Sequence, residues 1–130
     1  MLKPGLQATI EETVGEAMTA VTLGSGDVPV LGTPAVVALA ERASCSAIED
    51  HLSEGQTSVG AWVELSHLAP TPQWAVVKAT SRLTQVEGSK LTFEFAVTDP
   101  GGEVARGVHR RVLVNRDQFL RQAGARPRET

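Results

Sequence analysis

The sequence predicts one α+β domain in which a single long helix packs against a curved antiparallel β-sheet. A helical repeat of apolar residues follows Thr33 and Pro34, and a long stretch of alternating apolar and polar residues follows that helix. Short turns separate the alternating runs, as is typical of antiparallel strands. A lone amphipathic helix has to bury its apolar side, and the sheet is the only sizeable surface available to it. The 130 residues are enough for one such domain, over 1–130, and leave little room for a second.

Two stretches before the helix are interpreted as strands. Residues 8–14 alternate between apolar and polar side chains, and residues 17–23 do so loosely. The glycine-containing segment 24–27 then interrupts regular structure.

The helix is expected from about Pro34 to about Leu52. Thr33 fits the N-cap, where a hydroxyl accepts from a free backbone N–H, and Pro34 fits the first helical position, where no donor is needed. Gly55 is expected to stop the helix. The apolar residues that recur at helical spacing are Val36, Val37, Leu39, Ala40, Ala43, Ala47 and Ile48.

Four strands and a loose polar tail are expected after the helix. In the first strand, regular alternation places Gly60 on the face opposite to Val63 and Leu65. The tail from Arg121 onward is polar and is expected to lack regular structure. The four strands are expected at 58–68, 74–86, 90–98 and 103–115.

Composition argues against several classes of function. The net charge is −3 and no basic stripe is present, so nucleic acid is not an expected partner. No apolar run approaches the roughly 20 residues of a membrane span, and the first residues lack the apolar run of a signal peptide. A single Cys45 cannot form an internal disulfide, and the cytoplasm is the expected location. Because His51, His67 and His109 are dispersed along the chain, no metal site is expected.

Thr33, Glu41 and His67 are the polar residues that interrupt or cap apolar elements. Each has an ordinary structural explanation: Thr33 as a helix cap, Glu41 on a solvated helix face, and His67 as a structural or exposed side chain beside a proline-rich turn. From spacing alone these explanations stay open for all three.

Several short segments between Leu31 and about Phe119 match one known pattern, and on them the chain resembles the fluoroacetyl-CoA thioesterase family of hotdog proteins. In that family a Thr at the helix start, a Glu in the helix and a His at the end of the following strand form the catalytic set, and Thr33, Glu41 and His67 fall on its spacing without a gap. The matching segments are Gly32-Thr33, Glu41-Arg42-Ala43-Ser44-Cys45, Ser58-Val59-Gly60, Glu64-Leu65-Ser66-His67, Val86-Glu87-Gly88 and Gly107-Val108-His109-Arg110-Arg111.

The resemblance implies a hotdog fold and hydrolysis of an acyl-CoA thioester, with coenzyme A present only as part of the substrate. It makes Thr33, Glu41 and His67 catalytic and assigns substrate contacts to Gly60, through its backbone N–H, and to Arg111. Histidine is suited to accept and return protons near neutral pH. Direct attack by Thr33 or Glu41, and activation of a water by Glu41 and His67, both remain open. A homodimer is the implied assembly, and pairing of two dimers into a tetramer stays open.

Some of these residues also have simpler explanations. Gly60 fits a bulge or bend in the sheet, Arg111 fits a solvated strand position, and Cys45 fits a small packed residue. His109 receives no role. The segment 21–30 contains no aromatic residue, although the family uses this region to cover the acyl group, so a general short acyl chain is expected in place of strict fluoroacetyl specificity.

Two other functions remain open from the sequence. One is a non-catalytic hotdog protein that binds acyl-CoA or a related ligand. The other is a hotdog hydratase or dehydratase, which the loop before the helix disfavours because it offers Asp27 but no histidine.

Overall fold

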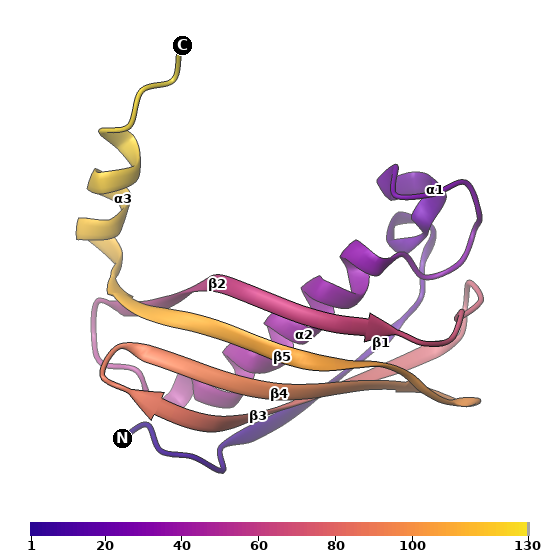
Figure 1. Cartoon of the computed structure of the whole chain (residues 1–130), viewed down its shortest axis with the longest axis horizontal. Helices are drawn as coiled ribbons and strands as arrows, with labels where there is room; N and C mark the ends of the chain where they lie inside the picture. Colours follow the sequence, from indigo (N-terminus) through magenta and orange to yellow (C-terminus); the bar gives the residue numbers. More distant parts are fainter. Residues whose placement is uncertain (130) are drawn as a thin grey trace.

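A five-stranded antiparallel sheet curves around one long helix in the computed structural model, which describes residues 1–129 (Figure 1). The order of strands across the sheet is β1-β3-β4-β5-β2, and every neighbouring pair is antiparallel. This confirms the predicted α+β class. The elements are β1 (Gln7–Thr13), the short 3-10 helix η1 (Glu16–Met18), α1 (Ala20–Leu23), α2 (Thr33–Ile48), the 3-10 helix η2 (Glu49–His51), β2 (Gln56–His67), β3 (Val76–Glu87), β4 (Lys90–Asp99), β5 (Gly102–Asn115) and α3 (Arg116–Gly124).

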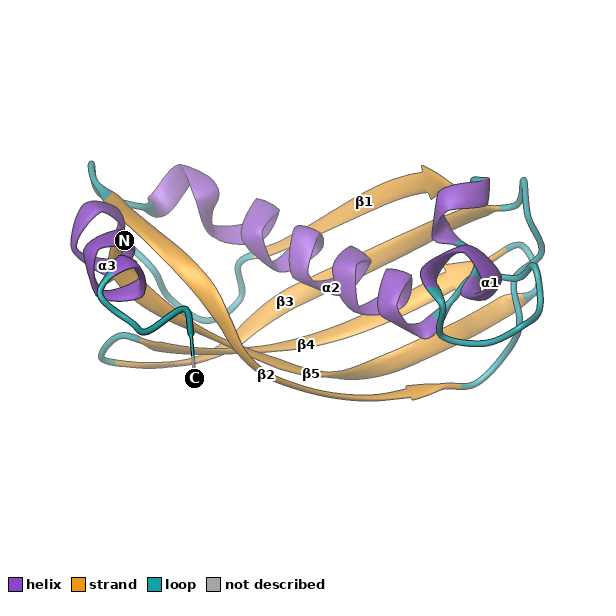
Figure 2. Cartoon of the chain, turned by 90° about the horizontal axis from the view of Figure 1, so that it is seen from above, coloured by secondary structure: helices purple, strands orange, loops and turns teal. Residues whose placement is uncertain are grey.

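Helix α2 lies along one face of the sheet, as the view from above in Figure 2 shows. Half of its buried residues are alanines, which let the helix backbone approach the strands closely. Inside this contact the buried Ser44 hydroxyl donates to the carbonyl of Ala40 and lies 2.8 Å from that oxygen, and it shares a 2.7 Å hydrogen bond with the hydroxyl of Ser81 on β3. The polar pair is therefore fully bonded within the core.

The start of α2 differs from the prediction. Gly32 is the N-cap, and no side chain caps the helix; Thr33 is the first helical residue, followed by Pro34. The N-cap role expected for Thr33 is therefore wrong. Its hydroxyl is left free for a contact outside the helix.

The strand expected over 17–23 is wrong, because this stretch forms η1 and the single-turn helix α1. The side chain of Thr19 accepts a hydrogen bond from the backbone N–H of Thr22, and Gly24 ends the turn in the left-handed region at φ 72°. A cap and a left-handed glycine five residues apart are enough to close one helical turn. The loose alternation of the segment did not reveal these local bonds.

The polar tail also begins as a helix. Asn115 caps α3 by accepting a hydrogen bond from the N–H of Gln118, 3.0 Å away, and Asp117 and Arg121 lie in its first and last turns. The negative charge near the N-terminus and the positive charge near the C-terminus interact favourably with the helix dipole. The loose conformation expected from Arg121 onward is therefore wrong as far as Gly124.

Strand β2 contains a bulge that reverses which residues share a face. Gly60 pairs with Arg111 and Trp62 pairs with Arg110, so Ala61 is an extra residue in the ladder. An extra residue shifts the alternation by one position. Gly60 consequently lies on the same face as Val63 and Leu65, toward α2, and the opposite-face prediction is wrong. Through this shift the glycine joins the helix side of the sheet.

No helix in the described part of the chain is both long and apolar enough to span a membrane.

Candidate functional site

Thr33 and His67 meet at the end of the molecule where α2 begins and β2 ends. Thr33 Oγ1 and His67 Nδ1 lie 2.8 Å apart, a hydrogen-bonding distance. The proline-rich turn that follows β2 and the free first turn of α2 bring them together, although they are far apart in sequence. An exposed hydroxyl bonded to an imidazole is the arrangement of a nucleophile or water-orienting group with its base.

The second ring nitrogen of His67 is buried and has no hydrogen-bond partner among residues 1–129. A buried polar atom without a partner costs free energy, and native proteins rarely leave one unpaired. If Nδ1 accepts the Thr33 proton, Nε2 carries a hydrogen. That N–H is then available to a group from outside this chain.

Glu41 lies with Gly60 and Arg111, about two helical turns along α2 from Thr33. Its Oε2 is 3.6 Å from the guanidinium of Arg111 on β5. Gly60 makes room for this carboxylate, because a Cβ atom built on Gly60 would lie only 2.6 Å from Glu41 Oε2. The missing side chain on β2 therefore defines where the carboxylate sits.

Arg111 is held firmly and is only 7% exposed. Its Nε donates to the hydroxyl of Ser58 at 2.8 Å, and another guanidinium nitrogen donates to the Ser58 carbonyl at 3.0 Å. The remaining nitrogen faces both Glu41 and His109. A planar fork with fixed donors suits this kind of multiple attachment.

His109 is the residue of this site to which sequence reasoning gave no role. It is 2% exposed on β5, its Nδ1 lies 2.9 Å from the carbonyl oxygen of Trp62, and its Nε2 lies 3.2 Å from Arg111. Its ring stacks on Phe93 at 6.3 Å between centroids. The alternation of β5 places it beside Arg111 on the same face, which was the available signal.

The candidates thus form two groups, Thr33 with His67 and Glu41 with Gly60 and Arg111. No hydrogen bond or ion pair joins the two groups within the chain. A shallow groove of about 540 Å³ runs over α2 and is lined by Glu41, Arg111 and Cys45, among others. Cys45 is half-buried in its wall. The carboxylate is therefore open to a molecule that lies along this groove.

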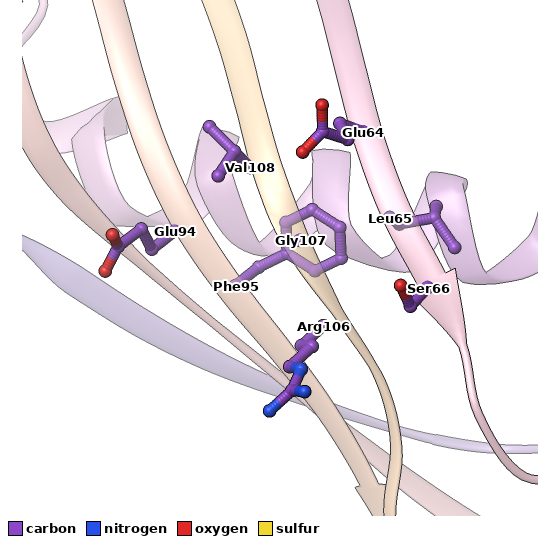
Figure 3. Close-up of a pocket in the computed structure, with 8 residues that line it drawn as sticks. All are labelled: Glu64, Leu65, Ser66, Glu94, Phe95, Arg106, Gly107 and Val108. Carbon is purple, nitrogen blue, oxygen red and sulfur yellow. The ribbon is translucent and has the colours of Figure 1, made fainter.

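A different hollow, of about 360 Å³, lies across β4, β5 and β2 on the sheet face away from α2 (Figure 3). Its rim carries Glu64, Glu94 and Arg106, and Phe95 and Gly107, which pair across β4 and β5, also line it. None of the five candidate site residues lines this hollow. It therefore stays separate from the chemistry discussed here.

Among residues 1–129 no cluster of three or more metal-ligating side chains is present.

Replacing Gly60 by alanine is expected to reduce activity more than stability. The new Cβ would push on the flexible end of Glu41, which can move at little cost to the fold, while the distances to His109 and Arg111, 3.4 and 3.5 Å, are tight but tolerable. A carboxylate displaced by about 1 Å can cost up to about 10²-fold in rate. Thermal unfolding and the thioester hydrolysis that the family resemblance implies are measured on the same preparation. Equal loss in both would contradict this expectation.

Burial lowers the pKa of His109 below its ordinary value of 6.5, and the charge of Arg111 lowers this pKa further. The hydrogen bond to the Trp62 carbonyl and the charge of Glu41 raise it, but the net shift is downward. The unfolded chain therefore takes up a proton at a pH where the folded protein does not. Below about pH 6.5 the free energy of unfolding should therefore decrease as the pH is lowered, by at most about 1.4 kcal/mol per pH unit from this residue. The decrease ends where the pH reaches the folded-state pKa.

Urea unfolding between about pH 5 and pH 8 checks this dependence. His109→Gln, which has no titrating group, should lack this part of the slope. A variant with the same slope as the wild type would show that His109 does not cause it.

Comparison with known proteins gives one consistent result. Residues 14–117 match the family model described as fluoroacetyl-CoA-specific thioesterase. A fluoroacetyl-CoA thioesterase from Streptantibioticus cattleyicolor is 31% identical over 90 residues, which are 69% of this chain and 65% of that protein. The match thus spans slightly less than two thirds of the relative.

Solved structures agree with this match. A structure of a fluoroacetyl-CoA thioesterase superposes with a TM-score of 0.90 at 25% identity, covering 98% of this chain and 99% of the other. A hot-dog-like protein from Thermanaerovibrio acidaminovorans superposes with a TM-score of 0.89 at 26% identity, covering 99% and 96%.

Proposed function

Because this chain belongs to the fluoroacetyl-CoA-specific thioesterase family and has its hotdog fold, we propose that it hydrolyses a short acyl-CoA thioester to the free acid and coenzyme A. The observation that carries the proposal is the 2.8 Å hydrogen bond between Thr33 and His67. Both residues lie within the segment matched by the family model. This contact joins a nucleophile-type hydroxyl to a base on the elements where the family pattern requires them.

His67 acts as the base of the reaction. Its Nδ1 accepts the proton of the Thr33 hydroxyl, or of a water in that position, as the oxygen attacks the thioester carbonyl carbon. A C–O bond forms, the C–S bond breaks, and the proton passes from His67 to the departing thiolate of coenzyme A. If Thr33 is the nucleophile, a water then cleaves the acyl ester with the same base.

Glu41 is the reacting carboxylate of the proposal, either as the nucleophile or as the group that orients the water. Arg111 supports this role because a cation 3.6 Å away stabilises the ionised carboxylate. The backbone N–H of Gly60 is proposed to donate to the carbonyl oxygen as negative charge develops on it. The proposed contact of Arg111 with the substrate stays a prediction, supported by its place in the lining of the groove beside Glu41.

The proposed substrate carries a short acyl chain. Residues 21–30, which precede Thr33, contain no aromatic side chain that could enclose one particular acyl group. Val21, Leu23 and Val28 supply only small apolar surfaces there, each at least 43% exposed. We therefore expect hydrolysis of several short acyl-CoAs at comparable rates.

We propose a homodimer built along the free edge of β2. This strand pairs only with β5, and residues 60–64 are exposed in succession. An open strand edge with unpaired N–H and C=O groups is suited to pairing with a second strand. Sedimentation equilibrium should give twice the chain mass of 13.7 kDa. The tetramer and the cytoplasmic location stay predictions.

The test of the function is release of free thiol from a panel of acyl-CoAs from acetyl to palmitoyl, with fluoroacetyl included. We expect turnover on the short members and a fall with increasing chain length. Turnover on fluoroacetyl-CoA alone would contradict the expected breadth. No turnover on any member would contradict the enzyme assignment and favour a protein that binds acyl-CoA without cleaving it.

A further inference from the structure

We infer that His109 is a positioning residue that orients Glu41 through Arg111. His109 has no contact with Thr33 or His67, and it is too deeply buried to meet a substrate. It contacts instead the same nitrogen of Arg111 that faces Glu41, and it lies on the strand next to Gly60. The inference rests on the proposed function, because Glu41 is a reacting group only there.

The contacts of His109 fix which nitrogen carries the proton. Arg111 can only donate, so His109 Nε2, at 3.2 Å, must accept. Nδ1 then carries the hydrogen and donates to the carbonyl of Trp62 at 2.9 Å. The ring is therefore neutral and held as the Nδ1–H tautomer.

The bulge in β2 supplies the acceptor for this tautomer. Ala61 is the extra residue, and the carbonyl of the following residue, Trp62, meets the His109 side chain. Phe93 covers the ring from β4. Three neighbouring strands thus fix one imidazole in one orientation.

A fixed neutral acceptor directs the guanidinium. Ser58 holds one side of Arg111 and His109 holds the nitrogen that also faces Glu41. Without the acceptor, only the two hydrogen bonds to Ser58 would remain to orient the guanidinium toward the carboxylate. Because Gly60 leaves Glu41 room to move, Arg111 is the contact that determines where the carboxylate points.

Three substitutions of His109 test whether its hydrogen-bond acceptor is needed or only its volume. His109→Gln keeps an oxygen that can accept from Arg111, His109→Asn keeps only a donor near Trp62, and His109→Leu keeps neither. We expect kcat for acyl-CoA hydrolysis to fall by up to about 10²-fold in the Leu and Asn variants, with KM little changed and with partial recovery in the Gln variant. Equal kcat in all three, or a change confined to KM, would overturn the inference.

Two further measurements do not depend on turnover. Long-range ¹H–¹⁵N NMR of the wild type should show His109 as a neutral imidazole protonated on Nδ1; protonation on Nε2 would overturn the inference. Crystal structures of the variants should retain the Arg111–Glu41 contact in the Gln variant and lose it in the Leu variant. If the wild type hydrolyses no acyl-CoA, the proposed function fails, and these two measurements still decide whether His109 positions Arg111.

Discussion

Replacing His67 by alanine is expected to lower kcat for acyl-CoA hydrolysis by about 10²–10⁴-fold, the range for loss of a general base. The substitution removes the acceptor of the Thr33 hydroxyl. It also removes a buried nitrogen that has no partner in the chain, so the cost to folding should be small. Thiol release, with the folded fraction checked by circular dichroism, measures both effects.

The control is His51→Ala, since His51 is an exposed histidine of η2 at the other end of α2. It should leave kcat unchanged. A second check uses Thr33→Ala together with the double variant. If Thr33 and His67 act as a unit, the double variant should be no slower than the slower single variant. Unchanged turnover in His67→Ala would remove this histidine from the mechanism.

Replacing Gly107 by alanine is expected to cause a large loss of stability. A Cβ on this residue would collide with the backbone carbonyl of Glu64 and lie 2.9 Å from Cα of Leu65, both on β2. Backbone cannot move aside as a side chain can, so the β2–β5 ladder would have to shift. Overpacking of this kind costs about 1–3 kcal/mol or more. Urea unfolding should show a lower midpoint.

Gly15→Ala is the matched control, because the same atom on Gly15 would meet no heavy atom within 4 Å. Its unfolding midpoint should stay near that of the wild type. The contrast with Gly60 is also informative: there the nearest atom belongs to a flexible carboxylate, so activity should fall before stability does. A Gly107→Ala protein as stable as the wild type would show that β2 can shift freely against β5.

The sequence was sufficient to predict the elements whose apolar pattern is buried. Helix α2 and strands β3 and β4 lie against each other in the core, and their repeats of 3.6 and 2 residues record that burial. The order of one helix and four antiparallel strands, and hence the α+β class, followed from those repeats. The family resemblance then supplied the hotdog fold, and the family and structure comparisons confirm it.

The elements that sequence reasoning missed are those that bury little apolar surface. Helix α3 has no buried residue, and α1 is a single turn closed by Thr19 and Gly24, so neither leaves a hydrophobic repeat to detect. Their stability comes from caps, which are short local signals. The same reason explains the wrong N-cap: Thr33 has the right side chain for a cap, and only its tertiary contact with His67 shows that it is used elsewhere.

The site was predictable as a list of residues but not as a set of contacts. Spacing along the chain brought Thr33, Glu41 and His67 together as candidates, yet it could not say that Glu41 lies with Arg111 instead of with His67. His109 was overlooked because the alternation of β5 places it on the face of Arg111 but carries no sign of its partner on β2. Its role depends on a neighbour across the sheet, at the bulge in β2.

Because of that bulge, the number of residues between Gly60 and His67 matters for the site. The two positions differ by an odd number, and in an uninterrupted strand an odd difference would put them on opposite faces. The unpaired Ala61 restores the match. Losing any one residue from this stretch would leave the chemistry of every remaining side chain intact and still turn either Gly60 or His67 away from the helix. Homologous proteins that share this site should therefore vary in the identity of these residues more readily than in their number.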